Sequence, residues 1–421
     1  METEKYSAFL DESLYINKLS NGLTCYIIPK RKYAEKQAVI CVNCGSLDER
    51  LEIGDETAEI PDGAAHFLEH KLFENETNHI FNSFMKLGAS VNAYTTFSST
   101  AYYFNCFDGF DENLRLLLNF TSNPWITDEN VEKEKGIICQ EINMYRDNPF
   151  WRVYFNLLDA MYEKCPVRKN IAGSVESVMS IDKDILLKCF KGFYYPGNMA
   201  LICAGDFDGE SSRQSVYAAA ETLRDDRAAG ALKRAHGLEP ETVNRVKTEE
   251  RMSVSRPMFN IGFKEKVTDE TNIALRIVSA KILMDVLAGE SSDFFRDLYE
   301  DEKADGPFGF EYLSGEGYGA SVLSNSCDNP DDAVERIINE IQNLKLNGVN
   351  EDRFELIRTK HLGRFARSFN SIDAITNGAV DLFSKSIDFF NILRAYDECS
   401  AEMINDRLRG MDNYSVSIAR P

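Results

Sequence analysis

The chain lacks long apolar runs and has little positive charge. No stretch approaches the roughly 18 consecutive apolar residues that a membrane-spanning helix needs. The charged beginning of the chain, Met-Glu-Thr-Glu-Lys-Tyr, lacks the apolar segment of a secretory signal. Lys and Arg total 47 against 68 Asp and Glu, and the formal charge of −21 disfavours binding to nucleic acid and anionic membranes. We therefore expect a cytoplasmic protein with no nucleic-acid or membrane partner.

Cysteine pairs with the spacing of a metal or redox site are nearly absent as well. The ten cysteines are scattered, and most lie in apolar stretches. Cys41 and Cys44 have a C-x-x-C spacing, but they sit in a strand-like run and no second pair completes a four-sulfur site. We expect the cysteines to be buried thiols.

The first half of the chain alternates strand-like and helix-like segments. Runs rich in Val, Ile and Tyr predict strands, whereas leucines at helical spacing and acidic residues at a segment's start predict helices. Strands are expected at residues 23–29, 38–44 and 199–204, with a strand pair at 90–107. Helices are expected at residues 64–73, 80–86, 112–121, 131–146 and 151–164.

Two pairs of segments suggest an internal duplication. Residues 111–119 resemble residues 331–339, and residues 126–134 resemble residues 349–357. The two offsets are nearly equal, at about 220 residues. The alternative is a chance likeness, because any helix with an acidic start resembles another. The chain length of 421 residues suits two domains and therefore strengthens the interpretation as a duplication.

A change in composition separates the two copies. Between about residues 206 and 251, charged residues and alanines dominate and glycines interrupt any long pattern, which is typical of a domain boundary. We predict a first domain at residues 1–228, a linker at residues 229–250 and a homologous second domain at residues 251–421.

The rarest pattern in the chain is His66-Phe-Leu-Glu-His70, within the expected helix at residues 64–73. Residues four apart on a helix differ by about 40° around its axis, so both imidazoles leave one face and can bind one ion. Glu69 lies on the flank of that face, where it can act on a water molecule without binding the metal. This H-x-x-E-H order occurs in zinc peptidases, and the alternative is two surface histidines on an amphipathic helix.

A zinc site of this kind needs a third protein ligand from another element. The other three histidines lie in a polar turn, in the predicted linker and in the second copy. The expected helix at residues 131–146 carries Glu134 and Glu141 on one face. Glu141 lies among isoleucines, where a carboxylate is costly unless it is paired or bound to metal. One glutamate can bind the metal while the other orients a histidine or the water.

These motifs resemble those of the insulinase/pitrilysin family of zinc peptidases, the inverzincins, over nearly the whole chain. Residues 63–74, Gly-Ala-Ala-His-Phe-Leu-Glu-His-Lys-Leu-Phe-Glu, are similar to the family's catalytic helix. Residues 132–141, Glu-Lys-Glu-Lys-Gly-Ile-Ile-Cys-Gln-Glu, are similar to its third-ligand helix. Further similar segments are residues 92–102, 172–178 and 195–206. The chain is identified as a short, two-domain member of bacterial type.

The resemblance implies an α+β fold of two homologous domains, each an antiparallel sheet backed by helices, as in mitochondrial processing peptidase-like metallohydrolases. It implies that zinc is bound by His66, His70 and Glu141, that Glu134 supports the site, and that Glu69 is the catalytic base. The second domain, by the same resemblance, carries no metal.

The resemblance also implies how a peptide binds. The segment that begins with Asn92, Ala93 and Tyr94 is similar to the family's edge strand, to which an extended peptide adds by main-chain hydrogen bonds. In the second domain, the substrate-holding Arg and Tyr of shorter members have no clear equivalents. The candidates to replace them are Arg296, Tyr312 and Tyr318.

The expected function is that of a zinc-dependent endopeptidase that hydrolyses unfolded peptides in a closed chamber, with a zinc-bound water as nucleophile and Glu69 as general base. The alternative is a weakly active or non-catalytic subunit of a heterodimeric peptidase-like complex. A small-molecule lyase with the same inverted motif is disfavoured, because such chains are short. We expect a homodimer, or a heterodimer with a related subunit.

Overall fold

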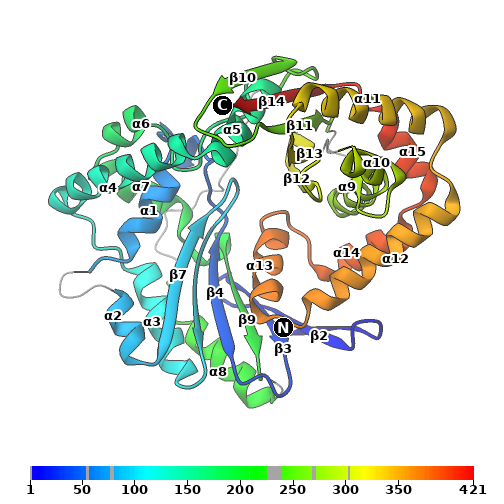
Figure 1. Ribbon diagram of the computed structural model, residues 1–421. Helices are drawn as coiled ribbons and strands as arrows, with labels where there is room; N and C mark the ends of the chain where they lie inside the picture. Colours follow the sequence, from blue (N-terminus) through cyan, green and yellow to red (C-terminus); the bar gives the residue numbers. More distant parts are fainter. Residues whose placement is uncertain are drawn as a thin grey trace. The chain divides into compact units, whose positions relative to one another are not determined.

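The computed structural model describes residues 2–53, 56–75, 80–207, 209–224, 239–267, 272–301 and 304–421. The chain divides into two units, each with its own sheet and helices (Figure 1). Unit 1 comprises Met1–Ile142, Asn170–Ala235 and Ala366–Phe390, and unit 2 comprises Asn143–Lys169, His236–Phe365 and Asn391–Pro421.

In the described part of unit 1, seven strands form one sheet in the order β1-β2-β3-β9-β4-β8-β7. The strands are β1 (Thr3–Ser7), β2 (Glu12–Lys18), β3 (Thr24–Pro29), β4 (Lys36–Val42), β7 (Ala89–Thr95), β8 (Thr100–Cys106) and β9 (Met199–Gly205). Every residue of the central strand β9 is buried, as its continuous apolar sequence requires. A separate hairpin joins β5 (Arg50–Ile53) to β6 (Glu56–Glu59).

Unit 1 contains eight described α-helices, of which four pack directly against this sheet. The eight helices are α1 (Ala64–Leu72), α2 (Ile80–Lys86), α3 (Phe110–Ser122), α4 (Asp128–Asp147), α6 (Val175–Ser180), α7 (Lys183–Phe193), α8 (Glu210–Ala220) and α13 (Ile372–Phe383). Helices α1, α2 and α3 pack against the β7–β8 end, whereas α13 packs against β4 and β9. Helix α4 belongs to unit 1 as far as Ile142.

Unit 2 contains five described strands in the order β10-β14-β11-β13-β12. They are β10 (Lys247–Arg251), β11 (Met258–Lys264), β12 (Gly309–Gly315), β13 (Tyr318–Ser326) and β14 (Tyr414–Arg420). The main helices are α5 (Pro149–Met161), α9 (Ile273–Ala288), α10 (Asp293–Glu300), α11 (Pro330–Asn347), α12 (Glu351–Ser368), α14 (Phe389–Glu398) and α15 (Ala401–Arg409).

The two units repeat one topology, which confirms the predicted pair of similar α+β domains. The strand order β3-β9-β4-β8-β7 of unit 1 returns as β10-β14-β11-β13-β12 in unit 2. The segments matched in the sequence fall on α3 and α11 and on α4 and α12. One expectation was wrong in detail, because neither sheet is purely antiparallel. Each sheet contains one parallel pair, β3 with β9 and β10 with β14, since the last strand returns through helical connections.

In each half of the sequence, one helix packs on the sheet that is formed mainly by the other half. Helix α5 follows α4 in sequence but packs on β11 and β14 of unit 2, and α13 follows α12 but packs on β4 and β9 of unit 1 (Figure 1). The contiguous domains predicted above do not include this exchange. Residues 229–238 of the predicted linker at 229–250 lie outside the described residues, and the bounds of the linker stay a prediction.

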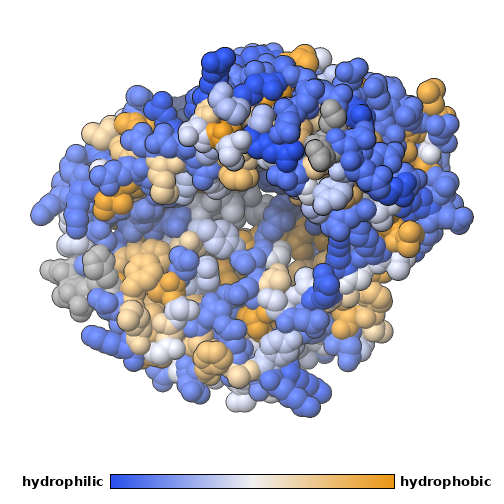
Figure 2. Space-filling model, viewed as in Figure 1, coloured by the Kyte–Doolittle hydropathy of each residue, from blue (hydrophilic) through white to orange (hydrophobic). Residues whose placement is uncertain are grey.

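Most predicted elements are confirmed, with ends that differ by a few residues. The helix expected at 80–86 spans those residues, whereas the one expected at 151–164 ends at Met161. Nine of the ten cysteines are buried and Cys139 is half-buried, as expected of structural thiols. Within the described residues, no helix combines the length and hydropathy needed to cross a membrane. The face shown in Figure 2 is largely hydrophilic, with apolar residues in small groups.

Candidate metal centre

Helix α1 places His66 and His70 side by side. The helix starts after Gly63, whose left-handed φ of 88° and close approach to the Ala172 carbonyl suit glycine, because a Cβ there would lie 2.4 Å from that oxygen. Most of the remaining α1 residues are buried and hold the helix against unit 1. The two imidazole rings lie 4.6 Å apart between centroids, on one face, as the four-residue spacing predicts.

Helix α4 brings a carboxylate to both rings. Its first turn is capped at Thr127, whose hydroxyl oxygen accepts from the Asn130 amide at 3.2 Å. Further along, Glu141 Oε1 lies 3.7 Å from His66 Nε2, and Glu141 Oε2 lies 3.5 Å from His70 Nε2. The ligand atoms of these three residues all lie within 4.8 Å of one another. This is a donor set of two imidazoles and one carboxylate, which suits zinc.

Glu134, two turns before Glu141, contacts the other side of a histidine. Its Oε1 lies 2.9 Å from His70 Nδ1. A carboxylate at this distance makes Nδ1–H the donor, so in the neutral form of the ring Nε2 carries the lone pair that faces Glu141. Burial acts to raise the pKa of Glu134, but its hydrogen bond to His70 and the charges of His70 and Lys71 bring that pKa below its ordinary value.

The two histidines have different electrostatic surroundings. Burial, together with the neighbouring His70, lowers the pKa of His66 to about 4, which keeps that imidazole neutral near pH 7. Burial also acts to lower the pKa of His70, but the Glu134 hydrogen bond and the three nearby carboxylates raise it above its ordinary value. His66 is therefore in the state that a metal ion binds, and His70 carries a proton on the nitrogen that faces Glu134.

Glu69 lies beside this group without belonging to it. Its Oε2 accepts a hydrogen bond from Thr95 Oγ1 at 2.6 Å, and Thr95 is the last residue of β7. Burial raises the pKa of the Glu69 carboxyl. Thr95 was not predicted from the sequence, although it lies one residue beyond the predicted segment 92–94.

The predicted peptide-binding residues lie on an edge strand. Strand β7 is last in the sheet order and pairs with β8, so that Asn92, Ala93 and Tyr94 lie opposite Tyr103, Tyr102 and Ala101. The Ala93 amide donates to Asn92 Oδ1 at 2.9 Å, so one amide of this strand is already bonded to a side chain. Tyr94 donates its hydroxyl proton to Asn377 Oδ1 at 3.0 Å.

The candidates in the second copy, Arg296, Tyr312 and Tyr318, lie on three different elements, α10, β12 and β13. Arg296 is an exposed residue of α10 that pairs with Asp293 at 2.9 Å. Tyr312 donates instead to Glu265 Oε2 at 2.7 Å and accepts from Arg276 Nε at 3.2 Å. Arg276 is distant from Tyr312 in the sequence, and no local pattern identified it.

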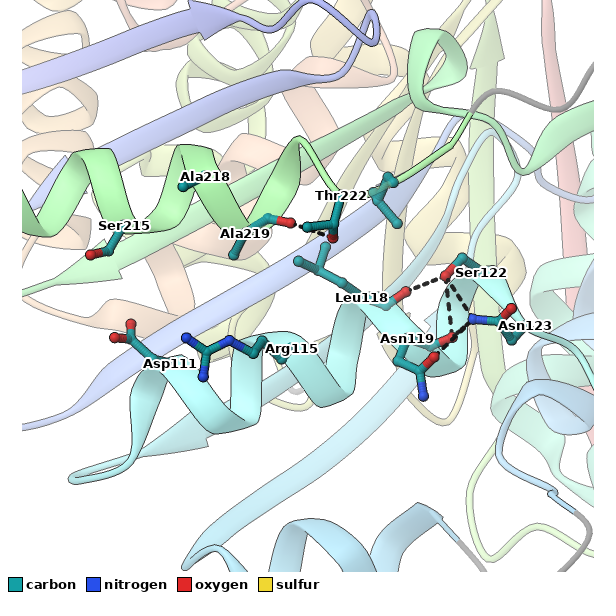
Figure 3. Close-up of a pocket in the computed structure, with 11 residues that line it drawn as sticks. Asp111, Arg115, Leu118, Asn119, Ser122, Asn123, Ser215, Ala218, Ala219 and Thr222 are labelled. Carbon is teal, nitrogen blue, oxygen red and sulfur yellow. Dashed lines mark hydrogen bonds between the residues drawn. The ribbon is translucent and has the colours of Figure 1, made fainter.

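A hollow of about 470 Å³ lies elsewhere on unit 1, between α3 and α8 (Figure 3). Its lining is about half polar and half apolar, and two of its hydroxyls bond to carbonyls of their own segments: Ser122 donates to the Leu118 carbonyl at 2.6 Å and Thr222 to the Ala219 carbonyl at 2.7 Å. None of the metal-centre residues lines it. The lining residues labelled on α3 include Asp111, Arg115 and Asn119, and those on α8 include Ser215 and Ala218.

Comparisons with known proteins identify one family. The family model described as insulinase (peptidase family M16) matches residues 28–175, and the one described as peptidase M16 inactive domain matches residues 180–360. The uncharacterized zinc protease YmfH of Bacillus subtilis is 36% identical over 406 residues, which cover 94% of this chain and 93% of that protein.

Solved structures give the same result for the fold. An M16-like peptidase from Alicyclobacillus acidocaldarius matches with a TM-score of 0.93 and 34% identity, covering 97% of this chain and 98% of that chain. A protease from Helicobacter pylori matches with a TM-score of 0.82 over 97% of this chain and 99% of that chain. At 16% identity, the second match supports the fold alone.

Proposed function

This chain belongs to the insulinase family of zinc peptidases, peptidase family M16, and from that premise we propose that it is a zinc-dependent endopeptidase acting on extended peptides. The observation that carries the proposal is the convergence of His66, His70 and Glu141 within 4.8 Å, with Glu69 beside them. A peptidase of this kind needs three protein ligands, a carboxylate for proton transfer and a surface that holds the peptide.

His66 and His70 would hold zinc through Nε2, and Glu141 would hold it through its carboxylate. The donor chemistry fits, because the Nε2 atoms of both rings face Glu141. A zinc ion there would supply a Lewis acid that lowers the pKa of a water molecule and polarises a peptide carbonyl. Glu134 would fix the His70 ring through Nδ1, which sets both the tautomer and the direction of Nε2.

Glu69 would move the protons. Thr95 holds Oε2, so we assign the transfer to Oε1. This oxygen would accept a proton from the attacking water and then donate it to the amine of the departing peptide. The site's low exposure raises the pKa of Glu69, which makes its protonated form more accessible for the second transfer.

Strand β7 would hold the substrate. It is the last strand of its sheet, and Thr95 at its end contacts Glu69. A peptide that adds to this edge beside Asn92, Ala93 and Tyr94 would therefore run towards the catalytic carboxylate. Main-chain hydrogen bonds select an extended backbone more than particular side chains, so we expect broad sequence tolerance and a preference for unfolded peptides.

The test compares wild type with Glu69→Gln. Both proteins should bind zinc, measured by metal analysis, but the variant should cleave a quenched-fluorescence peptide pool at least about 100-fold more slowly, because it cannot accept the water proton. Glu129→Gln is the control, since Glu129 is an exposed residue of the first turn of α4 and should leave the rate unchanged.

A Glu69→Gln variant that binds zinc and cleaves as fast as wild type would contradict the mechanism. A wild-type protein that binds zinc and cleaves peptides after addition of a related subunit, but not before, would instead support the heterodimeric alternative.

A further inference from the structure

Lys71, the residue after His70, has a side chain that is fully buried. Its exposed fraction is 0%, and it is among the largest fully buried side chains described. A lysine ammonium is rarely buried in this way, because it loses its hydration and must find compensating partners. The partners of Lys71 therefore indicate what its charge does.

The ammonium of Lys71 lies between two carboxylates. Nζ donates to Glu74 Oε2 at 2.6 Å and to the Asn130 carbonyl at 3.1 Å, and it lies 3.9 Å from Glu134 Oε2. Both carboxylates are largely buried, with side-chain exposures of 7% for Glu134 and 16% for Glu74. Two buried carboxylates this close to one cation would repel each other without it.

The second oxygen of Glu134 leads to the metal centre. Glu134 Oε1 lies 2.9 Å from His70 Nδ1, and His70 Nε2 lies 3.5 Å from Glu141 Oε2. We propose that Lys71 is a positioning residue whose charge holds the Glu134 carboxylate against His70 and thereby aims His70 Nε2 at the zinc ion. The inference rests on the proposed zinc site. In it, Lys71 supports Glu134, which in turn supports the proposed ligand His70.

Removal of the Lys71 charge should make the positions of the Glu134 carboxylate and the His70 ring less fixed. With a neutral side chain at residue 71, the carboxylates of Glu74 and Glu134 repel each other, and Glu134 loses the contact that fixes its Oε2. The His70 ring then loses its fixed orientation. Partners that orient a metal-bound histidine typically contribute about 10-fold to 100-fold to metal affinity, so we expect an effect at the lower end of that range.

A purely structural role is the competing explanation. The bond from Lys71 Nζ to the Asn130 carbonyl joins α1 to the first turn of α4, where Asn130 Oδ1 also accepts from the Thr127 amide at 2.9 Å. If Lys71 only joined the two helices, its loss would lower the stability of the protein and leave the zinc affinity of the folded protein unchanged. Zinc affinity therefore separates the two explanations.

The experiment titrates the full-length chain with zinc against a competing chelator. Lys71→Met should raise the zinc Kd about 10-fold. The matched control is Lys135→Met: Lys135 is also a buried lysine, and its Nζ pairs with Glu132 Oε1 at 2.6 Å, three residues away on α4. The control should change the Kd by less than about twofold, because in the described part of the chain no second carboxylate connects this pair to a histidine. Urea denaturation of each variant verifies that it is folded.

A second pair of variants keeps the test decisive if Lys71→Met does not fold. Glu74→Gln removes the repelling carboxylate and should bind zinc like wild type. The double variant, Lys71→Met with Glu74→Gln, removes both charges. Its zinc Kd should lie between those of wild type and Lys71→Met, and it should be about threefold higher than the Kd of Glu74→Gln. Equal zinc affinities for Glu74→Gln and the double variant would overturn the proposal, as would a folded Lys71→Met with the wild-type Kd.

This result is separable from the proposed function. A wild-type protein that binds zinc while folded Lys71→Met binds it equally well overturns the role of Lys71 alone. A wild-type protein that binds no zinc overturns both proposals. Peptide cleavage is not needed for either conclusion.

Discussion

Two residues of the candidate metal centre, His70 and Glu69, have a partner that restricts the side chain. His70 is held through Nδ1 by Glu134, and Glu69 is held through Oε2 by Thr95. These contacts matter because a catalytic group must be held within a fraction of an ångström of its working position. At the scale of single residues, the orienting contacts are therefore as informative as the ligands.

Thr95 provides a test at this scale. We expect Thr95→Val to lower kcat about 10-fold, because Glu69 loses a hydrogen bond to its charged oxygen, while zinc content stays at the wild-type level. Thr95→Ser keeps the hydroxyl and should retain most of the rate. Steady-state kinetics on a quenched peptide, with metal analysis of the same samples, measures both. Equal rates for the Val and Ser variants would show that the hydroxyl does not position Glu69.

The proposed ligands and the supporting Glu134 could be predicted from the sequence, whereas the contacts of Thr95 and Lys71 could not. Helical spacing decides which side chains share a face, so His66 and His70 follow from their positions. The place of Glu141 among isoleucines makes it a candidate, and the family resemblance selects it over Glu134 as the third ligand. Thr95 and Lys71 contact groups on other elements. Their roles depend on how α1, α4 and β7 pack together, which residue spacing does not determine.

At the scale of elements, α9 and α12 of unit 2 take the places of α1 and α4 in the repeated topology. Asp285 on α9 lies 2.8 Å from both Lys360 Nζ and His361 Nε2, and 3.2 Å from Arg364 Nη1. At the offset of the repeat, Arg364 stands where α4 has Glu141. A metal cation would be repelled by the Lys360 and Arg364 charges in this cluster, so the cluster does not suit metal binding. We expect it to stabilise unit 2 instead.

We expect Asp285→Asn to lower the free energy of unfolding by about 3 kcal/mol at pH 7, because the surrounding groups lose a buried counter-ion. Burial acts to raise the pKa of Asp285, but His361 and Lys360 lower it to about 2. This value is below the ordinary 3.8. The stabilisation that the Asp285 carboxylate gives to the folded protein is therefore present above about pH 4 and is lost as the pH falls towards 2.

Urea denaturation at several pH values measures this effect. The difference between wild type and Asp285→Asn should be constant from pH 7 to about pH 5 and should shrink below about pH 4. The control is Asp293→Asn on α10, whose exposed carboxylate pairs with Arg296 and should contribute less than about 0.5 kcal/mol. A difference that persists undiminished at pH 3 would contradict the assignment.

The elements themselves were largely predictable, because each has a clear period or composition. The packing of α5 and α13 was not. An amphipathic pattern shows which face of a helix is buried but not which sheet covers that face, and both helices pack on the sheet of the other copy. The parallel strand pairs escaped prediction for a related reason, since strand direction depends on the connections between strands.

At the scale of the whole molecule, the exchanged helices imply that a contiguous half of the chain is incomplete. A fragment of residues 1–235 lacks α13, which buries Ile372, Ile375 and Val380 on packing against β4 and β9. We expect this fragment to expose an apolar surface, bind a hydrophobic dye and lack a cooperative urea transition. Addition of a peptide of residues 366–390 should reduce dye binding. A fragment that unfolds as cooperatively as the full chain would contradict this account.

Two expectations at this scale stay predictions. The resemblance to the insulinase family implies a closed chamber and pairing with a second copy or a related subunit. The acidic charge of −21 would favour the capture of basic peptides at low salt. Sequence reasoning reached the family and the two-copy organisation because motifs and repeats are local, whereas assembly depends on surfaces formed by several elements together.

Zinc-edge anomalous diffraction from crystals of the full chain grown with zinc would locate the proposed ion. We expect one strong peak in unit 1, about 2.0–2.2 Å from His66 Nε2, His70 Nε2 and the Glu141 carboxylate. Glu134 and Glu69 should lie outside the ligand shell. The absence of a peak between the three proposed ligands, or a zinc ion bound by other side chains, would contradict the proposed zinc site.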